Sequence, residues 1–406
     1  MSMVQGIQVL IPLVTFPYLV RVLGVEQFGL VSYALALVSF FIVFTDFGYN
    51  LTGTRDVAAS RADRAALSAL FSTKWAAQGL LLLVASAAFS ALVAVSVRLQ
   101  EDWLIYVLTF GLVPATILLP SWYFQGTQNF HFLATLQVAS RTLYAAGIFS
   151  LVKTPGDAWL VPLLNSSTAL VAALTGLWYV IMKDGIRFAW PGFAAMFASL
   201  RQGAAVFASS FAVTAYNYSA VLILGTLGND KLVGQFAVVE KILLVFRAGL
   251  STVFSVIFPR VCQLAGTGSA ESSRFLRTMS RWLLPALLAC SVLLAYFAVP
   301  ILQLAAGSHD PEMVALLRWM AWIPLLIGLN MASYQQLLAH RMQHSYTIVL
   351  VGAATGSVLL NLWWAPRYGA LGTAWAVLFA EGLIALGLIF ATECRHRHLA
   401  VWRWQR

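Results

Sequence analysis

The sequence is poor in charged residues. Only 10% of its 406 residues are Asp, Glu, Lys or Arg and only three are cysteine, whereas 60% are hydrophobic. Soluble domains carry about 25% charged residues, so this composition excludes a soluble enzyme. Three cysteines far apart give neither a disulfide framework nor a zinc knuckle.

The motifs of several enzyme classes are also missing. No Gly-x-x-x-x-Gly-Lys-Ser/Thr loop occurs, which excludes ATP hydrolysis by that route. No Asp-x-Asp pair occurs to hold a metal-bound sugar nucleotide, and no long outer loop could house a polymerase site. The histidines His340 and His344, and the group Cys394, His396 and His398, lie in basic stretches where we predict no metal site. We therefore expect no cofactor and a protein that moves a substrate rather than an enzyme.

Apolar stretches of membrane-spanning length fill the chain instead. A hydrocarbon core of about 30 Å needs about 20 apolar residues per helix. The first stretch has neither a basic n-region nor a cleavage site, so we expect a retained helix rather than a signal peptide. The sequence predicts an all-α polytopic membrane protein with about twelve spans, at 3–20, 28–49, 75–97, 103–124, 132–151, 158–182, 204–227, 232–258, 282–304, 313–338, 345–364 and 369–392.

The basic residues between the spans predict the orientation. With both termini cytoplasmic, sixteen lie on the cytoplasmic side and five on the other, which satisfies the positive-inside rule. The net charge of +10 therefore indicates topology, and no nucleic-acid partner is expected. The sixteen are Arg55, Arg61, Arg64, Lys74, Lys183, Arg187, Arg201, Arg260, Arg274, Arg277, Arg281, Arg341, Arg395, Arg397, Arg403 and Arg406.

The chain divides into two sets of six predicted helices. The cytoplasmic linker at 183–203 separates an N-terminal lobe, 1–190, from a C-terminal lobe, 191–406, which ends in a short basic cytoplasmic tail. Glycine turns recur before three spans, at Arg21-Val-Leu-Gly24, Thr226-Leu-Gly228 and Tyr368-Gly-Ala-Leu-Gly372. Internal duplication is common in secondary transporters, where the substrate binds between the repeats.

Ionisable residues inside the spans are candidates for function. Each costs about 2.5–3.5 kcal/mol near a helix centre, so each should face a bundle interior or a wet cavity. Arg141 is the deepest, and Gln137 and Tyr144 extend its helical face. The alternative for Arg141 is an ion pair with an acid on a neighbouring helix. The seven are Asp46, Arg141, Glu240, Lys241, Arg247, Arg318 and Glu381.

Other polar positions suggest a lined cavity, each with a structural alternative. Glu240 and Arg247 share a helix face and could pair locally, or Glu240 could exchange a proton or Na⁺. Asp46 could serve as a coupling residue or as an interfacial cap. A polar stripe ending at Asn217 could line the cavity or bond between helices.

Several segments resemble one family of transporters. These are Pro17-Tyr18-Leu19 with Arg21-Val-Leu-Gly24, Asp46-Phe47-Gly48-Tyr49-Asn50 with Thr54-Arg55, Trp122-Tyr-Phe-Gln125-Gly126, Val233-Gly234 with Glu240-Lys241-Ile242, and Tyr368-Gly-Ala-Leu-Gly372. They resemble the polysaccharide transporter family, which contains the O-antigen flippases, within the multidrug/oligosaccharidyl-lipid/polysaccharide exporter superfamily.

The resemblance implies two pseudo-symmetric six-helix lobes around a cation-lined cavity in the bacterial inner membrane. The protein would move an undecaprenyl-diphosphate-linked oligosaccharide to the periplasmic leaflet by alternating access, coupled to H⁺, Na⁺ or Cl⁻. A polysaccharide polymerase and a chain-length regulator are possible membrane partners. Substrate contacts are expected from Arg141, Lys241, Arg247, Arg55, Gln137, Tyr144 and Asn217, and ion coupling from Glu240 and Asp46.

Three alternatives stay open. A multidrug cation antiporter of the same superfamily would need an acid-dominated cavity. A membrane-embedded glycosyltransferase or polymerase would need a metal or a sugar nucleotide. A non-transporting scaffold would tolerate neutralisation of Arg141.

Overall fold

The structure, a computed structural model, describes residues 2–307, 310–395 and 399–402, and side chains from residue 11 onward. All secondary structure in these residues is helical. The chain forms two compact units, Met1–Leu222 and Ile223–Arg406. The boundary predicted at 190/191 divides the chain into two sets of six spans, and it stays a prediction.

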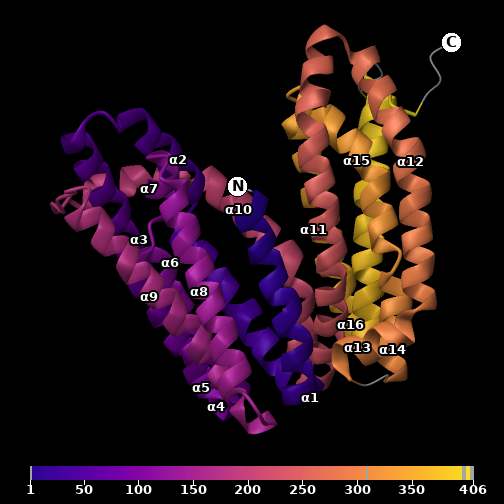
Figure 1. Cartoon of the computed structure of the whole chain (residues 1–406), viewed down its shortest axis with the longest axis horizontal. Helices are drawn as coiled ribbons and strands as arrows, with labels where there is room; N and C mark the ends of the chain where they lie inside the picture. Colours follow the sequence, from indigo (N-terminus) through magenta and orange to yellow (C-terminus); the bar gives the residue numbers. More distant parts are fainter. Residues whose placement is uncertain (1, 308–309, 396–398, 403–406) are drawn as a thin grey trace. The chain divides into compact units, whose positions relative to one another are not determined.

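The first unit contains the helices up to most of α10 (Figure 1). Their bounds are α1 (Ser2–Asp46), α2 (Tyr49–Ser60), α3 (Arg64–Val95), α4 (Val97–Glu101), α5 (Trp103–Phe110), α6 (Leu112–Leu118), α7 (Ser121–Gly126), α8 (Phe130–Leu151), the 3-10 helix η1 (Pro155–Asp157), α9 (Leu160–Met182) and α10 (Phe193–Thr226).

The second unit contains the remaining helices. They are α11 (Asp230–Thr267), α12 (Ser269–Tyr296), α13 (Ala298–Ala306), α14 (Pro311–Met320), α15 (Ile323–Ala339), α16 (Gln343–Phe390) and the π-helical turn η2 (Ala391–Arg395). Residues 259–281, which lie between the predicted spans 232–258 and 282–304, are helical except at Gly268, so α11 and α12 extend beyond the predicted spans.

The number of spans agrees with the prediction. Nine helical stretches of the described chain are long and apolar enough to cross a membrane. Two of them, Ile11–Ser60 and Gln343–Arg395, contain a glycine break at Gly24 (φ 79°) and Gly369 (φ 57°), so each supplies two predicted spans. α8 adds another with 22 residues. The all-α architecture of about twelve spans is confirmed.

The repeated glycine turns share one backbone conformation. Gly24, Gly228 and Gly369 all have left-handed φ angles, at 79°, 72° and 57°. This region disfavours residues with a Cβ atom, so glycine lets the chain reverse between consecutive spans. The three sequence echoes are therefore the same structural device, which precedes the second and eighth predicted spans and opens the twelfth.

One end of the first unit is held by aromatic packing around the Asp46-Phe47-Gly48 turn. Phe47 and Gly48 both have left-handed φ angles, of 47° and 76°. The Phe47 ring stacks on Phe207 of α10, with centroids 4.5 Å apart and planes within 6°. A Cβ atom at Gly203 would lie 2.6 Å from the Phe47 carbonyl oxygen. The turn and α10 therefore pack backbone against backbone.

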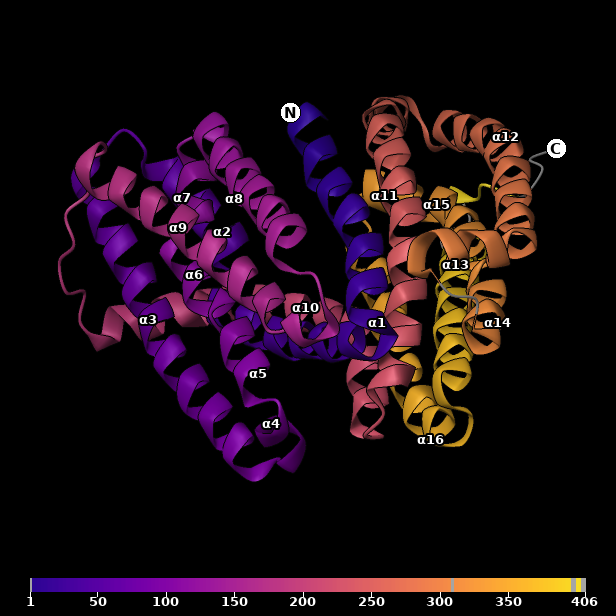
Figure 2. The ribbon, with the colours of Figure 1, turned by 60° about the horizontal axis from the view of Figure 1, so that its bottom comes forward.

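Different helices form the two ends of the first unit. In two views α2 and α7 lie together at one end and α4 and α5 at the other (Figures 1 and 2). α8 packs on α9 and α1, and α6 packs on α9. At the break between α5 and α6, the Ser166 hydroxyl donates to the Leu108 carbonyl at 2.6 Å. The middle of this bundle contains the cavity described next.

Candidate functional site

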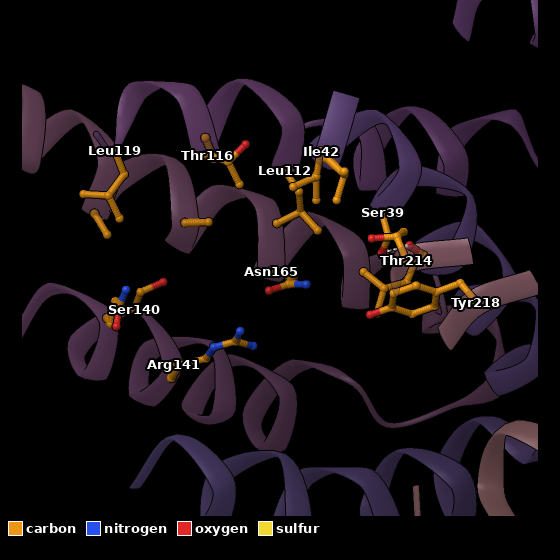
Figure 3. Close-up of a pocket in the computed structure, with 16 residues that line it drawn as sticks. Ser39, Ile42, Leu112, Thr116, Leu119, Ser140, Arg141, Asn165, Thr214 and Tyr218 are labelled. Carbon is orange, nitrogen blue, oxygen red and sulfur yellow. Dashed lines mark hydrogen bonds between the residues drawn. The ribbon is translucent and has the colours of Figure 1, made fainter. Parts of the chain in front are cut away.

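A cavity of about 830 Å³ lies within the first unit (Figure 3). Five helices line it, α1, α6, α8, α9 and α10. Its apolar lining is Leu35, Ile42, Val43, Leu112, Ala115, Leu119, Ala169 and Ala172, and its polar lining is Ser39, Thr116, Gln137, Ser140, Arg141, Asn165, Thr214 and Tyr218. Amphipathic ligands are bound by such a mixture of apolar surface and convergent polar groups.

Arg141 is the charged residue of this lining. It lies midway along α8, and Figure 3 shows its guanidinium directed into the cavity. Within the described part of the chain it makes no hydrogen bond and no ion pair. A cation at this depth is costly unless water or a ligand solvates it. Arg141 therefore keeps all five guanidinium N–H donors available to an anion.

Only part of the polar stripe predicted on α8 lines the cavity. Gln137 and Ser140 line the cavity beside Arg141. Tyr144 is half-buried and does not contribute to the lining. Gln137 and Arg141 are one turn apart at i and i+4, so both side chains lie on the same face of α8. The spacing argument thus identified two neighbouring groups on one wall.

The polar stripe predicted on α10, at Ser210, Thr214 and Asn217, reaches the cavity only at Thr214. Thr214 and Tyr218, at i and i+4, line the cavity, whereas Asn217 is exposed and outside the lining. The sequence reasoning also missed Thr116 and Asn165. Asn165 is an amide within an apolar helix, the same signal that identified Gln137.

In the second unit, Arg247 forms an ion pair that the sequence did not predict. Its Nη2 atom lies 3.1 Å from Oε1 of Glu381, which joins α11 to α16. The local pair with Glu240, one of the two alternatives that the sequence left open, does not form among the described residues. Glu240 is half-buried, and Lys241 and Arg247 interact electrostatically with its carboxylate. Glu381, which had no partner by sequence, thus neutralises Arg247.

Arg55 lies at the α2 and α7 end of the first unit. It is exposed and donates to Asp56 Oδ1 through Nε at 3.1 Å and Nη2 at 3.0 Å. Asp56 also accepts from Lys74, whose Nζ lies 3.0 Å from Oδ2 and 4.6 Å from the centre of the Tyr49 ring. Lys74 is buried and Arg55 is exposed, so this end contains a buried cation beside an exposed one.

Asp46 is the last residue of α1 and directly precedes the left-handed turn at Phe47 and Gly48 that leads into α2. Its interpretation as an interfacial cap stays a prediction. Its predicted part in ion coupling stays a prediction.

The described residues contain no group of three or more His, Cys, Asp or Glu side chains able to hold a metal. His396 and His398, which were considered with Cys394, lie outside the described residues.

Comparisons with known proteins give a consistent picture. A family model described as "Polysaccharide biosynthesis protein" matches residues 1–265. A protein of Escherichia coli (strain K12) named "Putative O-antigen transporter" is 27% identical over 397 residues, covering 96% of this chain and 94% of its own length. A Shigella dysenteriae protein of the same name is 22% identical over 394 residues, covering 96% and 98%.

Two solved structures share the fold. An inward-facing multidrug resistance MATE family transporter of the MOP superfamily superposes with a TM-score of 0.76 at 12% identity, covering 98% of this chain and 96% of its own. The lipid II flippase MurJ, in an inward closed conformation, gives a TM-score of 0.73 at 14% identity, covering 97% and 87%.

Proposed function

This chain belongs to the polysaccharide biosynthesis protein family, and on that premise we propose that it is a lipid-linked oligosaccharide flippase. It moves undecaprenyl-diphosphate-linked O-antigen or exopolysaccharide repeat units from the cytoplasmic to the periplasmic leaflet of the bacterial inner membrane. The names of its relatives, which are transporters, and its flippase-like fold support transport rather than catalysis.

Arg141, unpaired in a cavity of about 830 Å³, is the observation that carries this proposal. A diphosphate carries a charge of about −2, and burying an isolated charge in low dielectric is prohibitive. Charge-assisted hydrogen bonds from a guanidinium to phosphate oxygens offset that cost. Gln137 and Asn165 add amide groups for the remaining phosphate oxygens or for sugar hydroxyls.

The other predicted cations act at different stages of the transport cycle. Arg55, exposed at the end that the basic residues are predicted to place in the cytoplasm, attracts the diphosphate at the entrance. Lys241 and Arg247 contact it later, and Arg247 must first leave Glu381, 3.1 Å away. Tyr144 and Asn217 are proposed contacts outside the cavity of the first unit.

Ion coupling resets the emptied transporter. With the cytoplasm negative, outward movement of an anion gains up to about 2.3 kcal/mol per charge per 100 mV. The return of a cationic empty cavity is then the step that an incoming H⁺ or Na⁺ assists, or Cl⁻ as a counter-ion. Glu240 and Asp46 are the residues that we propose to carry the coupling ion. Partnership with a polysaccharide polymerase and a chain-length regulator belongs to the same proposal.

A multidrug cation antiporter fits less well, although a MATE transporter shares the fold. The cavity lining contains one cation and no Asp or Glu, so it repels organic cations. Such a transporter needs the opposite charge at this position.

The proposal is tested by measuring the surface polysaccharide of cells that lack their own flippase and carry this chain or a variant of it. The parent chain and the matched control Arg318→Ala, which removes a membrane-embedded arginine outside the cavity, should restore the polymer. Arg141→Ala should not, and Arg141→Lys should restore it in part, because lysine keeps the charge without the guanidinium fork. Full restoration by Arg141→Ala at equal protein abundance would exclude a substrate contact and favour a scaffold.

A further inference from the structure

A second pocket lies at the α2 and α7 end of the first unit, away from the cavity. Its volume is about 440 Å³, and it forms where the turn between α2 and α3 meets the turn between α7 and α8 and the end of α9. The lining residues that carry the argument are Arg61, Arg64, Tyr123, Gln128, Asn129 and Asp184. None of them belongs to the flippase cavity.

The backbone of the α7–α8 turn holds one of the two arginines in place. Gln128 has a left-handed φ of 62°, which is uncommon for a residue with a side chain. The turn is closed by a bond from the Asn129 N–H to the Phe124 carbonyl at 2.8 Å. This conformation lets the Gln128 Oε1 atom accept from Arg61 Nη1 at 3.0 Å. Arg61 is thereby oriented while four of its five N–H donors stay available.

Arg64 adds a second cation to the pocket. Its side chain is exposed and makes no hydrogen bond or ion pair with any residue that the structure describes. One acid, Asp184, also lines the pocket, and its Oδ2 atom accepts from the Tyr123 hydroxyl at 2.9 Å. Two guanidinium groups against one carboxylate leave the pocket with a net positive charge, which fits a monoanionic phosphodiester.

Apolar side chains flank the pocket on the helices that form it. Trp178, Ile181 and Met182 are exposed on the last two turns of α9, which ends just before Asp184. Phe130, exposed at the start of α8, follows Asn129 directly. Exposed apolar residues on a membrane-spanning helix contact acyl chains, so the pocket lies beside the polar boundary of the bilayer.

We propose that this pocket binds the phosphate of an anionic phospholipid headgroup, such as phosphatidylglycerol or cardiolipin, with the acyl chains lying along α8 and α9. Basic pockets between membrane helices on the cytoplasmic side recognise such headgroups. The same donors could hold free phosphate, but the flanking apolar surface gives the lipid additional contacts. The site is independent of the proposed transport and holds whichever substrate the cavity takes.

Lipid binding to the purified full-length protein tests this site. Phosphatidylglycerol, phosphatidylcholine and inorganic phosphate are titrated separately, with native mass spectrometry and the melting temperature as readouts. Phosphatidylglycerol should bind and raise the melting temperature, and the other two should not. Equal protection by phosphatidylcholine would overturn the site, whereas protection by inorganic phosphate alone would overturn the lipid assignment.

Three variants show whether the lipid binds to this pocket or is attracted only by the overall positive charge of the protein. Arg61→Gln/Arg64→Gln should weaken phosphatidylglycerol binding by about 25-fold, since each arginine near an anionic lipid contributes about fivefold. Arg260→Gln/Arg274→Gln, a matched control, removes two exposed arginines from the second unit and should leave this binding unchanged. Asp184→Asn keeps an acceptor for Tyr123, removes the like charge and should tighten binding.

The opposite pattern contradicts the proposal. If both arginine pairs weaken binding equally, the effect is bulk charge and no pocket exists. If Asp184→Asn weakens binding instead of tightening it, the carboxylate is not repelling the ligand. The melting temperature of each variant without added lipid shows whether its fold is intact.

Discussion

The Arg247–Glu381 pair predicts a large cost when either partner is removed alone. The exposed fractions of the two side chains are 28% and 6%, and their charged atoms lie 3.1 Å apart. Arg247 Nε is buried without a hydrogen-bond partner, so Glu381 supplies the compensation for this guanidinium. Removing one partner of a buried pair costs about 3–5 kcal/mol, because the other charge is left uncompensated. Glu381→Leu and Arg247→Met should therefore each destabilise the second unit by about this amount.

Replacing both partners should cost much less than the two single changes together. A buried pair exchanged for apolar residues of similar volume is often neutral. We expect Arg247→Met/Glu381→Leu to recover most of the stability, so that the coupling energy approaches the summed cost of the two single changes. Unfolding by sodium dodecyl sulfate in mixed micelles gives the four free energies of the double-mutant cycle. Single costs that simply add, within about 0.5 kcal/mol, would refute the reasoning.

The same cycle tests whether Arg247 also contacts the substrate. If its role is purely structural, the folded double variant should flip lipid at the parent rate. If Arg247 leaves Glu381 to bind the diphosphate, the double variant should be stable but should flip lipid more slowly than the parent. The two outcomes separate stability from transport.

Further predictions concern the α2 and α7 end of the first unit. Gly203→Ala should destabilise by about 1–3 kcal/mol, because its Cβ atom would lie 2.6 Å from the Phe47 carbonyl oxygen; chemical unfolding measures this, and a neutral result would contradict the close packing. Lys74→Met should cost about 3 kcal/mol, since it leaves the half-buried Asp56 without its buried partner. Arg55→Ala should cost less than about 1 kcal/mol, because Arg55 is 71% exposed, but should slow flipping; equal stability losses at Lys74 and Arg55 would show that burial does not set the cost.

The membrane architecture could be predicted from sequence because it follows from local composition. About 20 apolar residues define a span wherever they occur. The recurring glycines predicted turns, and Gly24, Gly228 and Gly369 all adopt the same left-handed conformation. The helical continuation through 259–281 was not predicted, because its polar residues look like a linker when tertiary contacts are unknown. There, Gln336 Nε2 donates to Ser272 and Ser273 at 3.0 and 3.1 Å.

The cavity was predictable only where one helix supplied the signal. Gln137 and Arg141 share a face of α8, so periodicity joined them. The neighbours Thr116, Asn165 and Tyr218 come from three other helices, and sequence spacing gives no information on their proximity. The partner of Arg247 was missed for the same reason, because Glu381 lies on α16 and its contact with α11 is tertiary.

Leaflet accessibility of a labelled undecaprenyl-diphosphate oligosaccharide in proteoliposomes tests the central claim most directly. The parent protein and Arg318→Ala should move the lipid between leaflets under an imposed H⁺ or Na⁺ gradient, and Arg141→Ala should not. Flipping by Arg141→Ala at the parent rate would contradict the role of the cavity. If the parent fails to move this lipid under either gradient while it extrudes organic cations, the flippase proposal itself is wrong.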